Sequence, residues 1–328
     1  MKVLVPYPDD ILNVIREIIG SKATVLQSDR TIESMLSVGS DADVVASGRV
    51  PEEYIRSAKS LRMIQGFGAG IDKIDRNAVL ERGDVIVCNS HVNAPEVAEY
   101  AIMLLLAMAK QIILCDREMR MGNWRLAWGG PSPNAELRNK TCLIVGLGNI
   151  GTEIAKRLRA FDITVIAATR TGESQNAHFV QSIVRIGEAK ETIQMADFII
   201  LSLPLTEESM NLVDEEFLSW MKPTSLLVNI SRGEIIDEAA LYQSLKGNGI
   251  AGAALDVWWD YPEVWGGSGK MPSEKFPFHQ LENVILSPHR AAYSENIMRD
   301  QVRFVGENIL RFVEGKQPLN IVNMALGY

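Results

Sequence analysis

A glycine-rich hexapeptide, GLGNIG at residues 146–151, is the first group of residues whose types and spacing indicate a chemistry. It follows the apolar segment CLIV and precedes TEIAKRLRAF, and this strand-turn-helix context is what the G-x-G-x-x-G pattern of dinucleotide-binding proteins requires. Gly146 permits a tight turn, Gly148 lets backbone amides approach a pyrophosphate, and Gly151 allows the helix to pack closely on the sheet. The sequence therefore predicts a dinucleotide site here, and the alternative is a glycine turn without a ligand.

The residues after the next predicted strand indicate which dinucleotide is bound. NAD-specific folds place Asp or Glu at the end of that strand, about 20 residues after the glycines, where it binds the ribose hydroxyls. Here the segment is VIAATRT, and Thr169 stands at the acidic position. No carboxylate repels a 2'-phosphate, and Thr169, Arg170 and Thr171 could bind one, which favours NADP. In the alternative, Arg170 stacks on the adenine or is solvated, Glu173 supplies the carboxylate, and NAD is possible.

The elements that position these residues follow from the hydrophobic pattern. Apolar, β-branched segments alternate with segments of helical periodicity, which is typical of βαβ units around a parallel sheet. Strands are predicted at 3–5, 43–46, 63–66 and 85–88, and then at 142–145, 164–167, 198–201, 225–230, 252–256 and 284–286. We predict an α/β fold with two doubly wound parallel-sheet domains. Residues 97–292 would form a Rossmann NAD(P)-binding domain, and 1–96 plus 293–328 a flavodoxin-like substrate (catalytic) domain.

Two predicted helices connect these blocks. Residues 95–121 contain no Gly or Pro after the first position and carry apolar side chains at helical spacing, which predicts one long helix crossing between the domains. Residues 293–313 also predict a helix, which we expect to return to the first block. The Gly- and Pro-rich segment 261–278 predicts a surface loop near the ligand cleft.

The composition excludes several other classes of protein. The 328 residues are 47% hydrophobic, enough for two domain cores, and the formal net charge of -8 argues against nucleic acid or an acidic membrane as partner. Three cysteines, Cys88, Cys115 and Cys142, lack disulfide-framework or zinc-site spacing. The start MKVLVPYPDD lacks signal-peptide character and the longest apolar run, 101–109, is too short to span a membrane, so we expect a cytoplasmic protein.

Further motifs follow one another along nearly the whole chain. They are GFGAGIDKID at 66–75, NAPEVAEYA at 93–101, LPLTEES at 203–209, VNISRGEIIDEAAL at 228–241, AALDVW at 253–258 and LSPHRA at 286–291. Together with GLGNIG they make the chain resemble the D-isomer-specific 2-hydroxyacid dehydrogenase family. That family includes glyoxylate and hydroxypyruvate reductases, D-lactate and phosphoglycerate dehydrogenases and, more distantly, formate dehydrogenases. The resemblance implies hydride transfer between a nicotinamide cofactor and a small 2-keto or 2-hydroxy acid.

The resemblance assigns chemical roles to two residues. Arg232 would grip the substrate carboxylate and keto oxygen, which suits a planar guanidinium that makes two parallel hydrogen bonds. His289 would be the acid-base group, since an imidazole titrates near neutral pH. The alternatives are a solvated loop arginine and a structural histidine.

The resemblance, the glycine turn at 146–151 and the turn at 169–171 also imply which residues contact the ligands. The turn of Gly68, Ala69 and Gly70 would offer amides to the substrate carboxylate, and His91 and Asn93 would approach from the interdomain hinge, although a structural role for His91 fits equally well. Core packing is the default for Trp124, Trp128, Trp258, Trp259 and Trp265, with a hydrophobic wall or a dimer contact as the alternative. The expected cofactor-lining residues are Gly146, Gly148, Asn149, Ile150, Gly151, Thr169, Arg170, Thr171, Leu203, Pro204, Thr206, Ile230, Ser231, Asp256 and Ala291.

The chain departs from the family pattern at one catalytic position. Most members carry a glutamate five residues after the aspartate that matches Asp256, and it stabilises the protonated catalytic histidine. Here that residue is Tyr261, and a phenol stabilises imidazolium less than a carboxylate does. His289 should then be protonated over a narrower, more acidic range, unless Asp260 or Glu263 approaches it. A rerouted dyad, an acid-shifted or weaker reductase, and a substrate outside the common set all stay open.

These inferences combine into one predicted activity. We expect a homodimeric oxidoreductase with its active site in the interdomain cleft, which reduces glyoxylate, hydroxypyruvate or a similar 2-keto acid with NADPH. Two other classes stay open. One is a nicotinamide-sensing binding protein of corepressor type, against which Arg232 and His289 argue. The other is a dehydrogenase of a formate- or phosphite-like anion, because the formate enzymes also lack the glutamate.

Overall fold

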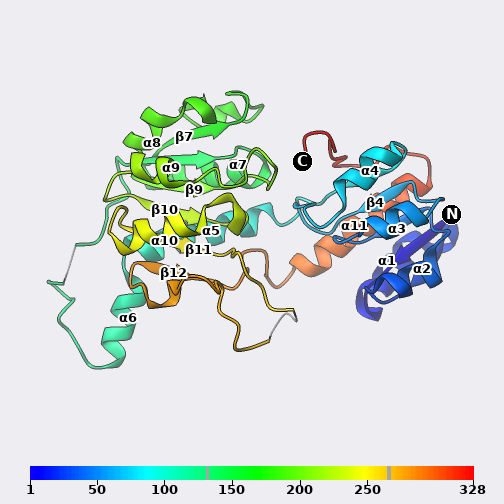
Figure 1. The fold of residues 1–328 in the computed structure, drawn as a ribbon, viewed down its shortest axis with the longest axis horizontal. Helices are drawn as coiled ribbons and strands as arrows, with labels where there is room; N and C mark the ends of the chain where they lie inside the picture. Colours follow the sequence, from blue (N-terminus) through cyan, green and yellow to red (C-terminus); the bar gives the residue numbers. More distant parts are fainter. Residues whose placement is uncertain (131–132, 264–266) are drawn as a thin grey trace. The chain divides into compact units, whose positions relative to one another are not determined.

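The computed structural model describes residues 1–130, 133–263 and 267–328. The chain forms two compact units (Figure 1). The first unit comprises Met1–Asn93 and Tyr293–Tyr328, and the second comprises Ala94–Ala292. Each is an α/β unit with an entirely parallel sheet. The predicted fold class is therefore confirmed.

The first unit has a five-stranded sheet in the order β2-β1-β3-β4-β5, which is the flavodoxin-like order. Along β1, Val3 and Val5 belong to a core cluster with α1 and α11, whereas Leu4 belongs to the cluster on the other face. This alternation lets helices cover both faces of the sheet. The strands are β1 Lys2–Val5, β2 Thr24–Gln27, β3 Val44–Ala46, β4 Met63–Gln65 and β5 Ile86–Cys88; the helices are α1 Asp9–Ile19, α2 Ile32–Gly39, α3 Glu52–Ser57, α4 Arg76–Arg82 and α11 Ile297–Val313.

The second unit has a seven-stranded sheet in the order β12-β11-β10-β9-β6-β7-β8. The strand order reverses at β6, as in dinucleotide-binding folds. Its core lies on both faces, with α5 and α7 on one side and α8, α9 and α10 on the other. The strands are β6 Thr141–Val145, β7 Thr164–Thr169, β8 Ser182–Arg185, β9 Phe198–Leu201, β10 Leu226–Asn229, β11 Gly252–Leu255 and β12 Val284–Leu286; the helices are α5 Ala94–Ala109, α6 Ile112–Arg120, α7 Asn149–Leu158, α8 Lys190–Met195, α9 Glu215–Trp220 and α10 Glu238–Lys246.

The prediction of one helix over 95–121 is wrong. The chain forms α5 and α6, which are bent by 61° at a break where Gln111 adopts a left-handed φ of 51°. Residues after α6 stabilise the break: the Ala135 amide donates to the Ala109 carbonyl at 2.9 Å, and Lys110 Nζ donates to the Ala135 carbonyl at 2.7 Å. The first bond satisfies a carbonyl that the end of α5 leaves unpaired. Within the described residues no single helix is long and apolar enough to cross a membrane, and α5 and α6 meet those criteria only as this bent pair.

The C-terminal helix α11 begins at Ile297, four residues after the predicted start at 293. It belongs to the first unit, where Asn308 Nδ2 donates to Gln65 Oε1 of β4 at 2.6 Å. The division between the units lies at Asn93 and Ala94, three residues before the predicted limit at 96. That the first unit binds substrate stays a prediction.

Candidate active site and nucleotide-binding edge

The candidate residues of the second unit follow six neighbouring strands at their carboxyl ends. The glycine turn follows β6 and Arg170 follows β7, and the segments at 203–206, 230–232, 256–261 and 287–291 follow β9, β10, β11 and β12. All carboxyl ends of a parallel sheet lie at one edge, and ligands of such folds bind there, where the strand order reverses. The fold therefore brings these predicted residues to one edge, here called the carboxyl edge.

The glycine turn after β6 has the shape that a bound pyrophosphate requires. A Cβ on Gly146, whose φ is 98°, would lie 2.5 Å from the Ser202 carbonyl oxygen, and a Cβ on Gly151 would lie 2.1 Å from the Gly146 carbonyl oxygen. Neither position accepts a side chain. A Cβ on Gly148 would meet nothing within 4 Å, and Gly148 caps α7 without a side-chain acceptor. The first amides of α7 are thus left for an external anion, and the residues fit a dinucleotide.

The turn after β7 is organised by Thr169. Its Oγ1 accepts a hydrogen bond from the Gly172 amide at 3.0 Å and donates to the Glu173 carbonyl at 3.2 Å. Arg170 and Thr171 are exposed beside it, and the side chain of Glu173 is also exposed. The turn therefore presents hydroxyl and guanidinium groups where NAD-specific folds have a carboxylate.

Serine hydroxyls hold the loops after β9 and β10, between the loops through Ser231 and within the first loop through Ser209. The Leu203 amide donates to Ser231 Oγ at 3.0 Å. Ser209 Oγ donates to the Pro204 carbonyl at 2.7 Å and accepts from the Thr206 amide at 2.7 Å. These bonds fix the backbone of three residues that the sequence predicted to line the cofactor, namely Leu203, Pro204 and Thr206.

Tyr261 contacts the predicted catalytic histidine directly. Its hydroxyl lies 3.0 Å from His289 Nδ1 and accepts a hydrogen bond from the Trp258 amide at 3.1 Å. Burial raises the pKa of Tyr261, and this outweighs the lowering effects of the Trp258 amide and the Arg232 charge. A neutral phenol therefore stands beside His289 at the sequence position where most of the family has a carboxylate.

The turn that carries His289 is held by the buried carboxylate of Asp256. Oδ1 accepts hydrogen bonds from the Arg290 amide at 2.8 Å and from Ser287 Oγ, and Oδ2 accepts from the Ala291 amide at 2.9 Å. His289 has a φ of 57°, a left-handed conformation that is uncommon outside glycine. These contacts position the histidine turn, and the role in lining the cofactor that the resemblance implied for Asp256 stays a prediction.

Arg232 lies close to the same segment. It follows the buried Ile230 and Ser231, is half-buried, and precedes the 3-10 helix η5, Gly233–Ile235. A Cβ on Gly233 would lie 2.4 Å from the Trp258 carbonyl carbon, so the arginine loop packs tightly against the chain that leads to Tyr261. Burial raises the pKa of Tyr261, and the nearby Arg232 charge offsets part of that rise. The structure thus brings Arg232, Tyr261 and His289 together.

Asp260 and Glu263 were the acids that the sequence offered as partners of His289. Asp260 Oδ2 accepts a hydrogen bond from the Glu274 amide at 2.9 Å, and Glu263 is exposed. The contact with His289 Nδ1 at this position comes from Tyr261.

The tryptophans divide into two groups. Trp258 and Trp259 pack in the core, and their indole nitrogens donate to the carbonyls of Ser287 and Ile236, as core packing predicts. Trp124 and Trp128 are 70% and 102% exposed, so the default of core packing is wrong for them. Their side chains lie on the segment after α6, beyond the helix break that the sequence did not predict. Trp265 lies outside the described residues.

The predicted substrate residues of the first unit follow β4 and β5. The carbonyls of Gly68 and Ala69 accept hydrogen bonds from the Ser90 amide at 3.0 Å and from Asn89 Nδ2 at 2.9 Å. A Cβ on Gly68 would meet nothing within 4 Å. Burial lowers the pKa of His91, which favours the neutral imidazole. Substrate binding by this turn and by His91 stays a prediction.

Sequence reasoning missed two residues of the histidine network. Ser287 Oγ bonds to Asp256, and the Tyr100 hydroxyl lies 2.8 Å from Ser287 Oγ, which links α5 to the histidine turn. Both residues stand inside quoted motifs, LSPHRA and NAPEVAEYA, so the motifs marked their segments. Their pairing across 187 positions is a tertiary contact that the motifs do not encode.

Comparison with known proteins places the chain in a family. The family model described as "D-isomer specific 2-hydroxyacid dehydrogenase, NAD binding domain" matches residues 102–291. Glyoxylate reductase of Pyrococcus furiosus is 33% identical over 325 residues, covering 96% of this chain and 93% of that protein. The chain therefore belongs to the D-isomer specific 2-hydroxyacid dehydrogenase family, as the sequence motifs predicted, and this is a family of oxidoreductases.

Other relatives extend the range of substrates found among similar proteins. D-3-phosphoglycerate dehydrogenase of Archaeoglobus fulgidus is 35% identical over 277 residues, covering 84% of this chain but 50% of that protein. The NADPH-dependent glyoxylate/hydroxypyruvate reductase of Sinorhizobium meliloti, solved in complex with NADP and malonate, has a TM-score of 0.79 and 29% identity. That match covers 99% of this chain and 97% of the other. Family membership thus supports a nicotinamide cofactor and a small hydroxy or keto acid, without selecting one substrate.

Proposed function

We propose that this protein reduces a small 2-keto acid of the glyoxylate or hydroxypyruvate type to the D-2-hydroxy acid with NADPH. The observation that carries the proposal is the cluster of Arg232, Tyr261 and His289 at the edge that also carries the glycine turn. The similarity to glyoxylate reductases and to an NADPH-dependent glyoxylate/hydroxypyruvate reductase supports the same substrate class.

Each side chain of the cluster has a distinct role in the proposed reaction. When bound, NADPH supplies the hydride that the 2-carbonyl carbon accepts. Arg232 binds the substrate carboxylate and polarises the carbonyl oxygen. His289 donates a proton to that oxygen as negative charge develops on it. Tyr261 orients the imidazole through Nδ1, so that Nε2 is left to act on the substrate.

The preference for NADP rests on the end of β7. Thr169 replaces the acid that would repel a 2'-phosphate, and Arg170 stands exposed next to it. Because the chain carries a net charge of -8, an additional phosphate must be held by local cations rather than by the overall field. Glu173 is the group through which NAD would be accepted instead.

A second candidate function is favoured by the Tyr261 contact. A neutral partner gives His289 less support as a proton donor than a carboxylate would. Oxidation of an anion such as formate or phosphite could place less demand on a protonated His289. The same cluster therefore suits a dehydrogenase of that type as the alternative.

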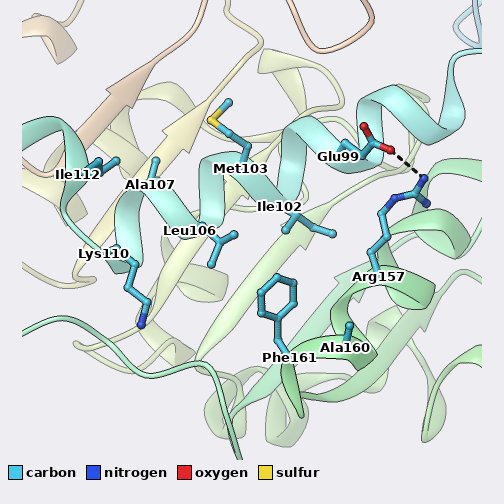
Figure 2. A pocket seen from close by; sticks show the side chains of 10 residues that line it. All are labelled: Glu99, Ile102, Met103, Leu106, Ala107, Lys110, Ile112, Arg157, Ala160 and Phe161. Carbon is cyan, nitrogen blue, oxygen red and sulfur yellow. Dashed lines mark hydrogen bonds and ion pairs between the residues drawn. The ribbon is translucent and has the colours of Figure 1, made fainter.

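We further propose that the protein is a homodimer formed through α5. An apolar pocket lies between α5 and the 3-10 turn that follows α7, where Ile102 and Leu106 point toward Phe161 (Figure 2). The Glu99–Arg157 ion pair, 3.2 Å long, lies at one end. The segment after α5 carries further exposed apolar side chains, which are Ile112, Ile113, Met119, Met121, Trp124 and Trp128. Exposed apolar surface of this extent is typical of an interface, and a second copy supplies matching apolar surface.

A steady-state panel tests the proposed reaction. Purified protein is assayed with glyoxylate and hydroxypyruvate against NADPH and NADH, and with formate and phosphite against NADP⁺ and NAD⁺. We expect keto-acid reduction with NADPH preferred, and a loss of about a hundredfold or more in kcat/KM for Arg232→Ala, because it removes a donor to the developing oxyanion. Arg138→Ala is the matched control, since Arg138 is exposed and precedes β6 at the opposite edge of the sheet.

The panel also separates the rivals. Turnover of formate or phosphite without keto-acid reduction would select the second candidate. Nucleotide binding without turnover of any compound would select a nicotinamide-sensing protein instead.

A further inference from the structure

A second arginine stands beside the proposed 2'-phosphate position, on the strand next to Thr169. Strands β7 and β8 pair in parallel, and the register places Arg185 directly opposite Thr169. Paired residues on neighbouring strands project from the same face of a sheet. The Arg185 side chain therefore leaves the sheet on the face from which Thr169 projects, at the carboxyl end of β8.

The turn after β7 folds back over the same arginine. Gly172 has a φ of 78°, a left-handed conformation that this turn needs and that favours glycine. A Cβ placed on Gly172 would lie 3.5 Å from the Arg185 amide nitrogen and 3.6 Å from Arg185 Cβ. The Gly172 amide donates to Thr169 Oγ1, which fixes the turn in this position. Residues 169–172 and Arg185 thus form one local structure, although Arg185 belongs to the next strand.

The exposed position of Arg185 leaves its charge accessible to an external anion. Arg185 is exposed, and in the part of the chain that the structure describes it forms no ion pair. Arg170 is exposed on the adjoining turn. Two guanidinium groups near a position that lacks the usual acid suit a phosphate monoester, which carries about 1.5 to 2 negative charges near pH 7.

We propose that Arg185 is a specificity-determining residue that binds the 2'-phosphate of NADP together with Arg170. This inference rests on the proposed preference for NADP and names a residue that the glycine motif and its following turn do not indicate. Because NAD has a neutral hydroxyl at the same position, Arg185 contributes to the affinity for NADP and adds little to that for NAD.

Binding measurements without turnover test the proposal. Dissociation constants of NADP⁺, NAD⁺, 2',5'-ADP and 5'-AMP are measured by calorimetry for the wild type, Arg185→Gln, Arg185→Lys and the control Arg138→Gln. The two small nucleotides differ only in the 2'-phosphate. We expect Arg185→Gln to weaken binding of NADP⁺ and 2',5'-ADP by about tenfold or more, as loss of one charge-assisted hydrogen bond does, with the affinities for NAD⁺ and 5'-AMP within about twofold of the wild type. Arg185→Lys should recover part of the loss.

The outcomes separate this inference from the proposed function. If the wild type prefers the 2'-phosphorylated ligands and Arg185→Gln binds them as tightly as Arg138→Gln does, Arg185 has no such role and the NADP proposal stands. If the wild type binds 5'-AMP as tightly as 2',5'-ADP, the NADP preference is wrong and the inference is overturned with it. Thermal unfolding of each variant shows that a loss of affinity comes from a folded protein.

Discussion

Tyr261 and His289 decide how the proposed proton transfer depends on pH. The phenol oxygen accepts a hydrogen bond from the Trp258 amide and contacts Nδ1 of the imidazole, so it can also accept a hydrogen bond from the imidazolium Nδ1–H. A neutral oxygen stabilises that cation less than a carboxylate would. Keto-acid reduction, which consumes the proton of His289, should therefore decline at a lower pH than in an enzyme with the usual glutamate.

Replacement of Tyr261 by glutamate tests this reasoning. The carboxylate can accept the hydrogen bond from the Trp258 amide, and its negative charge would stabilise the imidazolium form of His289. The pH above which kcat/KM for reduction falls should therefore rise by about one pH unit or more. The sign follows from the role of His289: the proton donor is active while protonated, and a negative neighbour keeps it protonated to higher pH. The measurement is the pH profile of kcat/KM with NADPH and a 2-keto acid.

Tyr261→Phe is the matched control for that experiment. It keeps the ring and removes only the hydroxyl that reaches Nδ1. It should lower kcat/KM without an upward shift of the profile. Identical profiles for the wild type and Tyr261→Glu would mean that this residue does not set the protonation of His289.

The chemistry-bearing residues could be predicted from the sequence, but their contacts could not. Arg232 and His289 stand in motifs that the sequence shows directly, and Tyr261 is identified by its place five residues after Asp256. The roles of Ser287 and Tyr100 depend on hydrogen bonds between distant segments, and the position of Arg185 opposite Thr169 depends on the pairing of β8 with β7. A motif gives residue types and spacing, whereas a network depends on which strand lies beside which.

At the scale of elements, the strands that the sequence did not predict are β2 and β8. Each is the outermost strand of its sheet, with its first and last residues exposed and its two central residues half-buried. They therefore lack the continuous apolar run of a buried parallel strand. The break between α5 and α6 was missed for a related reason. Neither Lys110 nor Gln111 is a helix breaker, and the bonds that stabilise the break come from residues about Ala135.

A charge placed on the exposed face of α5 tests the proposed dimer. Met103 lines the apolar pocket and is 42% exposed, so Met103→Glu would place a charge in the proposed interface. We expect this variant to run as a monomer in size-exclusion chromatography with light scattering, where the wild type runs as a dimer. Met195→Glu is the control, because Met195 is 55% exposed on α8, away from the pocket, and should leave the dimer intact.

Two results would contradict the proposed interface. A monomeric wild type would exclude the dimer itself. A dimer that Met103→Glu leaves unchanged would place the contact on another face.

At the scale of the whole molecule, the fold class follows from a simple regularity. Both units are parallel sheets with helices on both faces, and each strand end delivers one loop to a common edge. The alternation of apolar and helical segments is visible in the sequence, and a parallel sheet is the arrangement that accommodates it. This regularity turns residues spread from 146 to 291 into one site at the carboxyl edge of the second unit.

The central claim is that a hydride reaches the 2-carbon of a keto acid bound by Arg232. The most direct measurement follows hydroxypyruvate reduction with NADPH that is deuterated at both C4 positions, analysed by mass spectrometry and chiral chromatography, for the wild type and Arg232→Ala. We predict D-glycerate with one deuterium at C2 from the wild type and a loss of about a hundredfold or more in its rate of formation by the folded variant. Product without deuterium, or an undiminished rate from Arg232→Ala, would contradict the account.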